Sequence, residues 1–276
     1  MFSTPFTFLK FNAGGGGLDP DAQAFLTATG ITDPTIEGAI NTLVIDLKAA
    51  SLWTKMYAIY PFVGGTSTTC KYNLVDPQDT NAAFRIDFAG SWTFTSSGVQ
   101  GGGSNNYANT YFQCTNNLAS FYESSWGAYI NSTGSNTGMV FAAASAGATH
   151  IIQFTLSLPG VALLSPYASA NGFGVDEVIP HQGLNWCDLR GANNAAVLYL
   201  NTTTIGSGTI STMPAGSFNT NMFLGAKNQN DDLGDFQFST NARYGFAFIA
   251  DSIGAANVSN LVTIIQTFNT TLGRQV

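Results

Sequence analysis

Charged side chains are scarce in this sequence, where Asp, Glu, Lys and Arg together make up 9% of 276 residues. An ordinary soluble domain carries about 25%. Only nine residues are Lys or Arg, they form no cluster, and the formal net charge is −7. Phosphate neutralisation and attachment to an acidic membrane surface both need clustered cations. The sequence therefore disfavours nucleic-acid binding and a polybasic membrane contact, and its polar surface must come from neutral hydrogen-bonding residues.

Cysteine is also rare, and Cys70, Cys114 and Cys187 are odd in number and far apart. No Cys-x-x-Cys pair indicates zinc, and three cysteines cannot form a dense disulfide framework. We expect buried, reduced thiols; the alternative is one disulfide with a spare thiol. The N-terminal residues show no basic region followed by an apolar one, so no signal peptide is expected. No run of about 18 uninterrupted apolar residues predicts a membrane span.

Helices are predicted near both ends of the sequence. Asp19-Pro20 and Asp33-Pro34 each place a capping carboxylate before a proline at the first helical position. Gly30 predicts the end of the first helix. The second carries one apolar stripe at three- and four-residue spacing, formed by Ile36, Ile40, Leu43, Val44 and Leu47. A last helix is predicted from Ala255 to Leu272, with Gly273 as its C-cap.

Between about Tyr57 and Asp251, short apolar runs are separated by Gly, Ser, Asn and Thr, which is typical of many strands joined by turns. Residues 84–88, 91–95 and 152–158 alternate with a period of two, so each predicts a strand with one face on a core. Residues 197–200 and 244–250 are apolar on both faces and predict central strands. The sequence predicts a mainly β protein, an antiparallel β-sandwich of jelly-roll type with N-terminal helices and one C-terminal helix.

Two stretches then carry a family resemblance. Residues 195–207 resemble the strand, turn and strand hairpin of concanavalin A-like (laminin-G-like) sandwiches, with Thr202 where glycine is usual. Residues 221–228 are similar to that family's strand ending in a small-residue Gly-Ala step, here Gly225-Ala226. Together with residues 244–250 they cover roughly the last third of the chain. The resemblance implies a lectin/glucanase-type sandwich.

A broader likeness involves residues 19–26, 52–65, 72–77 and 267–276, which resemble modules at the ends of bacteriophage tail and virion structural proteins. It implies a virion surface protein, made in the host cytoplasm, that adheres to host-surface glycan as a spike or tail-fibre component. The expected partners are other virion proteins, further copies of this chain and a glycan. The alternative is a purely structural capsid, spike or decoration subunit. No enzymatic activity and no membrane insertion are expected.

A glycoside hydrolase of the same fold is the less favoured interpretation. Such enzymes pair carboxylates that act as acid and nucleophile about 5–5.5 Å apart. The three glutamates, Glu37, Glu123 and Glu177, show no alternating acidic pattern. His150 and His181 have no evident catalytic partner, and a hydrogen-bonded structural role suits each of them better.

Two candidate sites follow from residue types. The loop residues Asn230, Asp231, Asp232 and Asp235 offer the hard oxygen ligands that Ca²⁺ prefers. They lack a calcium-loop spacing, so a solvated hairpin loop is the favoured alternative and no cofactor is otherwise expected. Sugar rings stack on aromatic faces beside polar groups. Aromatic rings in suitably polar, Gly/Ser/Asn-rich surroundings belong to Tyr107, Trp126, Tyr167 and Trp186. The alternative for each ring is packing in the core or at its rim.

The sequence divides into an N-terminal segment, 1–17, and a single unit, 18–276, that joins the helices to the sandwich. Residues 1–17 contain Phe2, Phe6, Phe8, Leu9 and Phe11 before four glycines. Each large apolar side chain left in water forgoes roughly 1.5–3 kcal/mol of burial. The segment is therefore expected either to dock on its own sandwich or to anchor into a neighbouring virion protein by adding to a sheet edge.

Deletion of residues 1–17 distinguishes these two roles. An anchor is dispensable for the isolated fold, so the truncated protein should keep its melting temperature and drop out of assembled particles. A large loss of thermal stability would instead show that the segment belongs to the fold. The measurements are thermal unfolding of the purified protein and its incorporation into virions.

Overall fold

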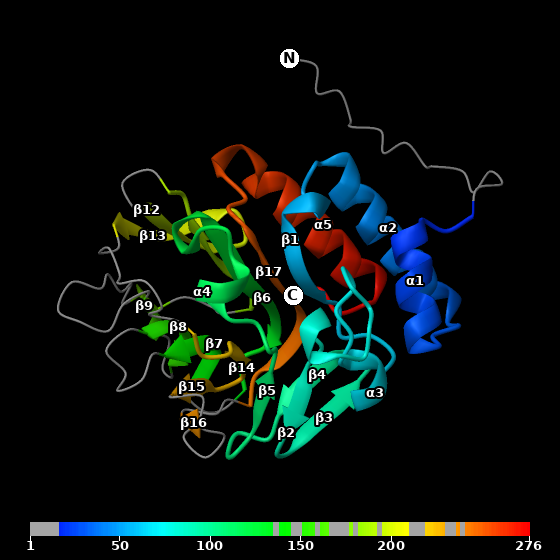
Figure 1. Ribbon diagram of the computed structural model, residues 1–276, viewed down its shortest axis with the longest axis horizontal. Coiled ribbons are helices and arrows are strands. Elements are labelled where there is room, and N and C mark those ends of the chain that lie inside the picture. Colours follow the sequence, from blue (N-terminus) through cyan, green and yellow to red (C-terminus); the bar gives the residue numbers. More distant parts are fainter. Residues whose placement is uncertain are drawn as a thin grey trace.

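The computed structural model describes residues 17–134, 138–144, 151–157, 161–165, 177–178, 182–191, 195–209, 219–229, 236–237 and 241–276. Its described strands form two mainly antiparallel sheets, which confirms the predicted fold class. Three helices, α1 (Pro20–Thr29), α2 (Pro34–Ala49) and α5 (Val258–Thr271), form a further layer against one sheet. Figure 1 shows these helices grouped together on the side of β1 and β17.

Sheet A contains eight described strands in the order β13-β12-β11-β6-β17-β4-β3, with β1 also paired to β17. Its bounds are β1 (Met56–Tyr60), β3 (Trp92–Thr95), β4 (Gly98–Gly101), β6 (Ser124–Ser132), β11 (Gly183–Leu189), β12 (Ala195–Leu200), β13 (Thr203–Thr209) and β17 (Arg243–Asp251). The two strands predicted to be central, β12 and β17, both have neighbours on each side. The first resembling stretch is the β12–β13 hairpin, which turns at Asn201 with φ 54°.

Sheet B contains nine described strands in the order β10-β9-β8-β7-β14-β5-β2, with β15 parallel to β7 and β16 paired to β15. Its bounds are β2 (Asp87–Ala89), β5 (Tyr107–Asn109), β7 (Gly138–Ala144), β8 (Ile151–Ser157), β9 (Val161–Ser165), β10 (Glu177–Val178), β14 (Phe223–Leu224), β15 (Lys227–Gln229) and β16 (Phe236–Gln237). The second resembling stretch forms β14, a turn at Gly225 with φ 83°, and β15.

Short helices connect these elements. They are α3 (Ser67–Cys70), α4 (Cys114–Asn117) and the 3₁₀ turns η1 (Trp53–Lys55), η2 (Asn81–Ala83), η3 (Phe121–Glu123) and η6 (Ala255–Asn257). The predicted capping devices are confirmed: Asp19 caps α1, Asp33 caps α2, and Gly30 ends α1 in the left-handed conformation. No helix among the described residues is long and apolar enough to cross a membrane.

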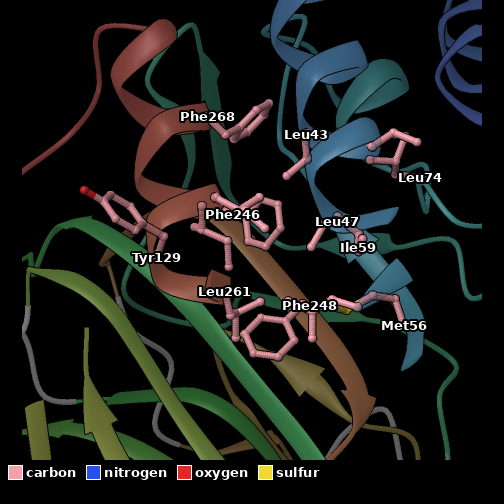
Figure 2. Close-up of a cluster of buried hydrophobic side chains, with 14 of the residues drawn as sticks. Leu43, Leu47, Met56, Ile59, Leu74, Tyr129, Phe246, Phe248, Leu261 and Phe268 are labelled. Atoms are coloured by element: carbon pink, nitrogen blue, oxygen red, sulfur yellow. The ribbon is translucent and has the colours of Figure 1, made fainter. Parts of the chain in front are cut away.

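The central strands of sheet A, β6, β11 and β17, are buried on both faces, and the pleat assigns their alternate residues to two separate cores. On β6, Trp126, Ala128 and Ile130 face sheet B in the sandwich core. Tyr129 points the other way, into a second core beneath the helices. Figure 2 shows Phe246 and Phe248 of β17 projecting toward α5 and α2. Because successive side chains of a strand point to opposite faces, a strand covered on both sides reads as a continuous apolar run.

A buried carboxylate fixes the start of the C-terminal helix. Asp188 of β11 is fully buried and accepts hydrogen bonds from the Ser252 hydroxyl at 2.8 Å and the Ile253 N–H at 3.0 Å. It also accepts from the Ser125 hydroxyl at 2.7 Å, and it pairs with Arg190 at 2.8 Å. A buried charge is tolerated when donors surround it in this way. The network attaches the segment that leads into α5 to the outer face of sheet A.

One expectation about local structure is wrong, and the favoured expectation for the cysteines is confirmed. Residues 84–88 were predicted to be one strand, but only Asp87 and Phe88 belong to β2. Phe84 follows the turn η2 with φ 57°, because its ring packs edge-on to Phe112 inside the core. The cysteines follow the favoured prediction: all three are free and buried, and burial raises the pKa of Cys70 to about 11 and that of Cys114 to about 12.

Gly127 tests the register of sheet A, because it lies opposite Trp186 on one side and Phe248 on the other. A Cβ at this position would lie 2.3 Å from the Trp186 Cβ, so Gly127→Ala should destabilise the protein by about 1–3 kcal/mol or more. Gly38→Ala is the control, since nothing lies within 4 Å of a Cβ on this α2 residue. It should stabilise by about 0.5–1 kcal/mol. Urea unfolding of both variants is the measurement, and an unaffected Gly127→Ala protein contradicts this register.

Candidate functional site

A group of polar and aromatic side chains gathers at the β2 edge of sheet B. In the β2–β5 pair, Asp87 lies opposite Asn109 and Ala89 lies opposite Tyr107. Ala108, between them, belongs to the sandwich core. Since side chains alternate along a strand, Asp87, Tyr107 and Asn109 occupy the outer face of the sheet.

Tyr111, just past β5, is held in an unusual backbone conformation. Its φ of 57° is left-handed, which is uncommon for a bulky residue. The Asn109 side chain accepts a hydrogen bond from the Tyr111 backbone N–H at 2.9 Å, and the Tyr111 hydroxyl donates to Asp87 at 3.2 Å. The Arg85 guanidinium lies 5.7 Å from the centre of the tyrosine ring, within cation–π range. Strained backbone of this kind persists where the surrounding contacts fix it.

Charges of both signs complete the group. The Lys71 ammonium lies 2.5 Å from Asp79, and Arg85 lies 3.6 Å from the same carboxylate. The Asp79 side chain is 49% exposed, and those of Lys71 and Arg85 are 20% and 25% exposed, so these ion pairs at the surface add little to stability. We call Lys71, Asp79, Arg85, Asp87, Tyr107 and Tyr111 the Tyr111 cluster.

A hollow of about 210 Å³ opens beside this cluster. It is lined by Ser67 and Thr68 of α3, by Lys71, and by residues 85–88. Ser67 and Thr68 are exposed, so their hydroxyls add neutral hydrogen-bonding groups to the two cations and the carboxylate. The hollow is small, but it adjoins Tyr111, because Arg85 and Asp87 both line it and contact the tyrosine side chain.

The pKa values of both tyrosines in the cluster are raised by this arrangement. Burial, followed by the nearby Asp87 charge, raises the pKa of Tyr107, whose ring stacks on Phe223 with centroids 4.6 Å apart. Burial first, then the charge of Asp87 and the hydrogen bond to it, also raises the pKa of Tyr111. Both phenols are therefore neutral donors at physiological pH. The cluster brings together two half-buried aromatic rings, hydrogen-bond donors and a carboxylate acceptor.

The structure corrects two of the four aromatic residues predicted to bind glycan. Trp126 is 1% exposed in the sandwich core, and Trp186 is 3% exposed beneath the helices, stacked on Tyr199 at 4.5 Å. Neither ring has a face open to a ligand. Both tryptophans have Gly-, Ser- and Asn-rich neighbours in the sequence, which suggested an exposed position. They lie on central strands of sheet A that are covered on both sides, so polar neighbours there do not mean that the ring is exposed to solvent. Tyr107 lies in the cluster, and Tyr167 lies outside the described residues.

The proposed calcium ligands Asn230, Asp231, Asp232 and Asp235 also lie outside the described residues, as do His150 and His181. Among the residues that are described, no three His, Cys, Asp or Glu side chains gather in a way that suits a metal ion. Glu37 lies on α2, Glu123 in η3 and Glu177 on β10, so the three glutamates belong to separate elements.

Sequence reasoning missed Lys71, Asp79, Arg85, Asp87 and Tyr111. A usable signal was present, because Arg85-Ile86-Asp87 places opposite charges two residues apart in a chain with few charges. Their convergence with Tyr111 depends on the pairing of β2 with β5 and on the left-handed Tyr111 backbone, neither of which has a sequence signature.

No protein-family model matches this sequence, and no curated protein matches it. Among solved structures, the chain is similar to domain 4 of an extracellular GH43 arabinanase from Geobacillus stearothermophilus in complex with arabinotriose. The TM-score is 0.51 at 14% identity, and the match covers 75% of this chain and 98% of that domain. It is also similar to a mutant of Trypanosoma rangeli sialidase displaying trans-sialidase activity, with TM-score 0.53 and 7% identity. That match covers 84% of this chain and 39% of the sialidase. At these identities the likeness shows the fold alone, a β-sandwich.

Replacing Asp87 by Asn tests the geometry of the cluster through the tyrosine titration. The substitution removes the charge that supports the raised pKa of Tyr111 and Tyr107, so both values should fall toward 10.0, while the part due to burial remains. A raised phenol pKa contributes stability that is present below pH 10 and is lost as pH rises through the folded value. The wild-type protein should therefore lose this contribution above about pH 10, and the variant should lose less. Tyrosine titration by absorbance is the measurement; unchanged values in the variant contradict the contact.

Proposed function

We propose that this chain is a non-catalytic glycan-binding protein and that the Tyr111 cluster is its binding site. The observation that carries the proposal is the position of Tyr111, whose left-handed backbone is held by Asn109 and whose hydroxyl and ring are fixed by Asp87 and Arg85. A ring fixed in advance costs little ordering entropy when a ligand stacks on it. Strained, over-determined residues of this kind concentrate at ligand sites.

The residue types of the cluster suit a sugar. The apolar face of a sugar ring packs on an aromatic ring, and its hydroxyls need donors and acceptors at fixed positions. Tyr107 and Tyr111 supply the rings, Asp87 accepts, and Lys71 and Arg85 donate. The two similar solved structures come from carbohydrate-active proteins, one of them with an arabino-oligosaccharide bound, which supports a sugar as the ligand class.

A binding role suits this chain better than a hydrolytic one. Glycoside hydrolysis needs an acid and a second carboxylate on either side of the bond to be cleaved. In the cluster, Asp79 is paired to Lys71 and Asp87 accepts from Tyr111, and the three glutamates lie on separate elements, away from the cluster residues in the sequence. We therefore place adhesion ahead of catalysis.

The virion setting rests on the sequence resemblance alone. In that setting the protein would lie at a bacteriophage surface and attach it to host glycan. The second candidate, a purely structural subunit, predicts incorporation into virions together with silence on every glycan tested.

An array of glycans probed with the purified protein tests the proposal. Tyr111→Ala and Tyr107→Ala should each weaken binding by at least about tenfold, which corresponds to about 1.4 kcal/mol. Alanine and tyrosine are strained alike at a left-handed position, so Tyr111→Ala removes the ring with little change in backbone preference.

Trp53→Ala is the matched control. Trp53 is also a half-buried ring with a cation above it, the Lys48 ammonium at 5.5 Å, but it lies on the helical side of the molecule. This variant should bind as the wild type does. Equal loss in all three variants, or no loss in the tyrosine variants, would contradict the proposed site.

A further inference from the structure

A larger hollow borders the opposite face of α3 from the Tyr111 cluster. Its volume is about 650 Å³, and it lies between the α1–α2 loop, residues 63–65, Ser96 at the tip of the β3–β4 hairpin, and the end of α5. Cavities of roughly 300–1,000 Å³ are the size in which small ligands bind. We call this hollow the α3 groove. Figure 1 shows α3 beside β3 and β4, at the margin of the helical layer.

The two hollows share one short helix. The α3 groove is bordered by Gly64, Gly65 and Thr69, and the smaller hollow by Ser67 and Thr68. At 3.6 residues per turn, Thr69 lies roughly opposite Ser67 on α3. A single helical turn, roughly 10 Å across with its side chains, therefore separates the groove from the Tyr111 cluster.

The chemistry of the α3 groove is neutral. Its lining carries five hydroxyl side chains, those of Thr32, Thr35, Thr69, Ser96 and Thr271. Aliphatic side chains, among them Ile31 and Leu272, provide the apolar part. The lining residues that the structure describes include no aromatic ring, lysine, arginine or histidine.

One charged residue, Asp33, belongs to the groove lining, and its carboxylate already accepts hydrogen bonds from the protein backbone. It accepts hydrogen bonds from the backbone N–H groups of Thr35 at 2.8 Å and Ile36 at 3.1 Å, as the N-cap of α2. The positive end of that helix is thereby satisfied from within the protein. The groove therefore favours a neutral, hydroxyl-bearing ligand over an anion or a cation.

The wall between the two hollows is rigid. The Thr66 hydroxyl accepts from the Thr69 N–H at 3.1 Å, and the Thr69 hydroxyl receives the Thr66 N–H at 3.3 Å, which forms a capping box. Gly64 has φ 85°, and a Cβ there would lie 2.6 Å from the Thr69 hydroxyl oxygen. The turn is thus formed in advance of any ligand, and so are the two hollows that it borders.

We propose that the Tyr111 cluster and the α3 groove are two parts of one surface that binds a linear oligosaccharide. One sugar ring stacks at the cluster, the chain crosses α3 over the exposed hydroxyls of Ser67 and Thr68, and neutral rings occupy the groove. This inference rests on the proposed function and specifies its ligand as a chain of several sugars. A ligand held at both places gains affinity with length until it spans them.

The test uses linear oligosaccharides of arabinan, xylan, cellulose and mannan, each in a series from disaccharide to hexasaccharide. In any series that binds, the hexasaccharide should bind the wild-type protein at least about tenfold more tightly than the disaccharide. Thr271→Trp places a large side chain in the groove from the end of α5 and should abolish that gain, with disaccharide binding unchanged. Thr263→Trp is the matched control, an exposed threonine two turns earlier on α5 that does not border the groove.

Thr32→Trp fills the groove from the α1–α2 loop and provides a second blocking variant if Thr271→Trp unfolds. Affinity that does not depend on length, or a length dependence that survives both blocking variants, overturns the two-part surface. If the Tyr111→Ala variant still loses binding in that case, the proposed function stands and this extension alone fails. If no series and no glycan on the array binds the wild-type protein, both fail.

Discussion

Burial of the central strands of sheet A on both faces is the constraint on which the rest of this structure depends. The helices α1, α2 and α5 cover one face and sheet B covers the other. The strands β6, β11 and β17 therefore have little room for larger side chains or for side chains that need solvent. Gly127 shows how tight this is, because the space that its missing Cβ leaves is filled by the Trp186 side chain. Even the carboxylate of Asp188 is buried there, and it is used to fix the segment that enters α5. Such doubly covered sheets leave few positions at which a ligand can reach a side chain.

The two hollows described above lie away from these central strands. The Tyr111 cluster lies at the β2 edge of sheet B, and the α3 groove lies where the helical layer meets the β3–β4 hairpin. Both combine residues of strands or helices with residues of connecting segments, and binding residues are often found on connecting segments held by a rigid scaffold. Charged side chains are scarce, with 9 basic and 16 acidic residues, or 25 in all. Four of these 25, Lys71, Asp79, Arg85 and Asp87, lie together in the Tyr111 cluster, which distinguishes it from the largely neutral remainder of the chain.

Sequence patterns predicted the parts of the fold that depend on local rules. Asp19-Pro20, Asp33-Pro34 and Gly273 mark helix ends because capping is a local interaction, and the runs in β12 and β17 read correctly as central strands. The error at residues 84–88 arose because a tertiary contact, Phe84 on Phe112, overrides the local alternation. The glycan-binding prediction failed at Trp126 and Trp186 for a related reason, since composition reports how polar the neighbours are and not whether another layer covers them. Of the three aromatic candidates that the structure describes, Tyr107 lies on β5, the strand next to the β2 edge of sheet B.

The strained backbone positions connect the fold to the proposed surface. Phe62, Phe84 and Tyr111 are bulky residues with φ between 47° and 57°, a conformation that costs about 1–2 kcal/mol per residue. Phe62 directly precedes the groove-lining Val63, and Phe84 directly precedes Arg85. Each of the two is over-determined from the core: the Phe62 carbonyl accepts from buried Arg274 at 3.1 Å, and the Phe84 carbonyl accepts from Tyr60 at 2.7 Å. Contacts with the core thus stabilise the left-handed backbone conformation of Phe62 and Phe84, which bulky residues rarely adopt. Both residues directly precede residues that line the two hollows. Core packing and the proposed binding surface are linked through these carbonyl contacts, so a substitution at Tyr60 or Arg274 should disturb that surface although neither side chain belongs to it.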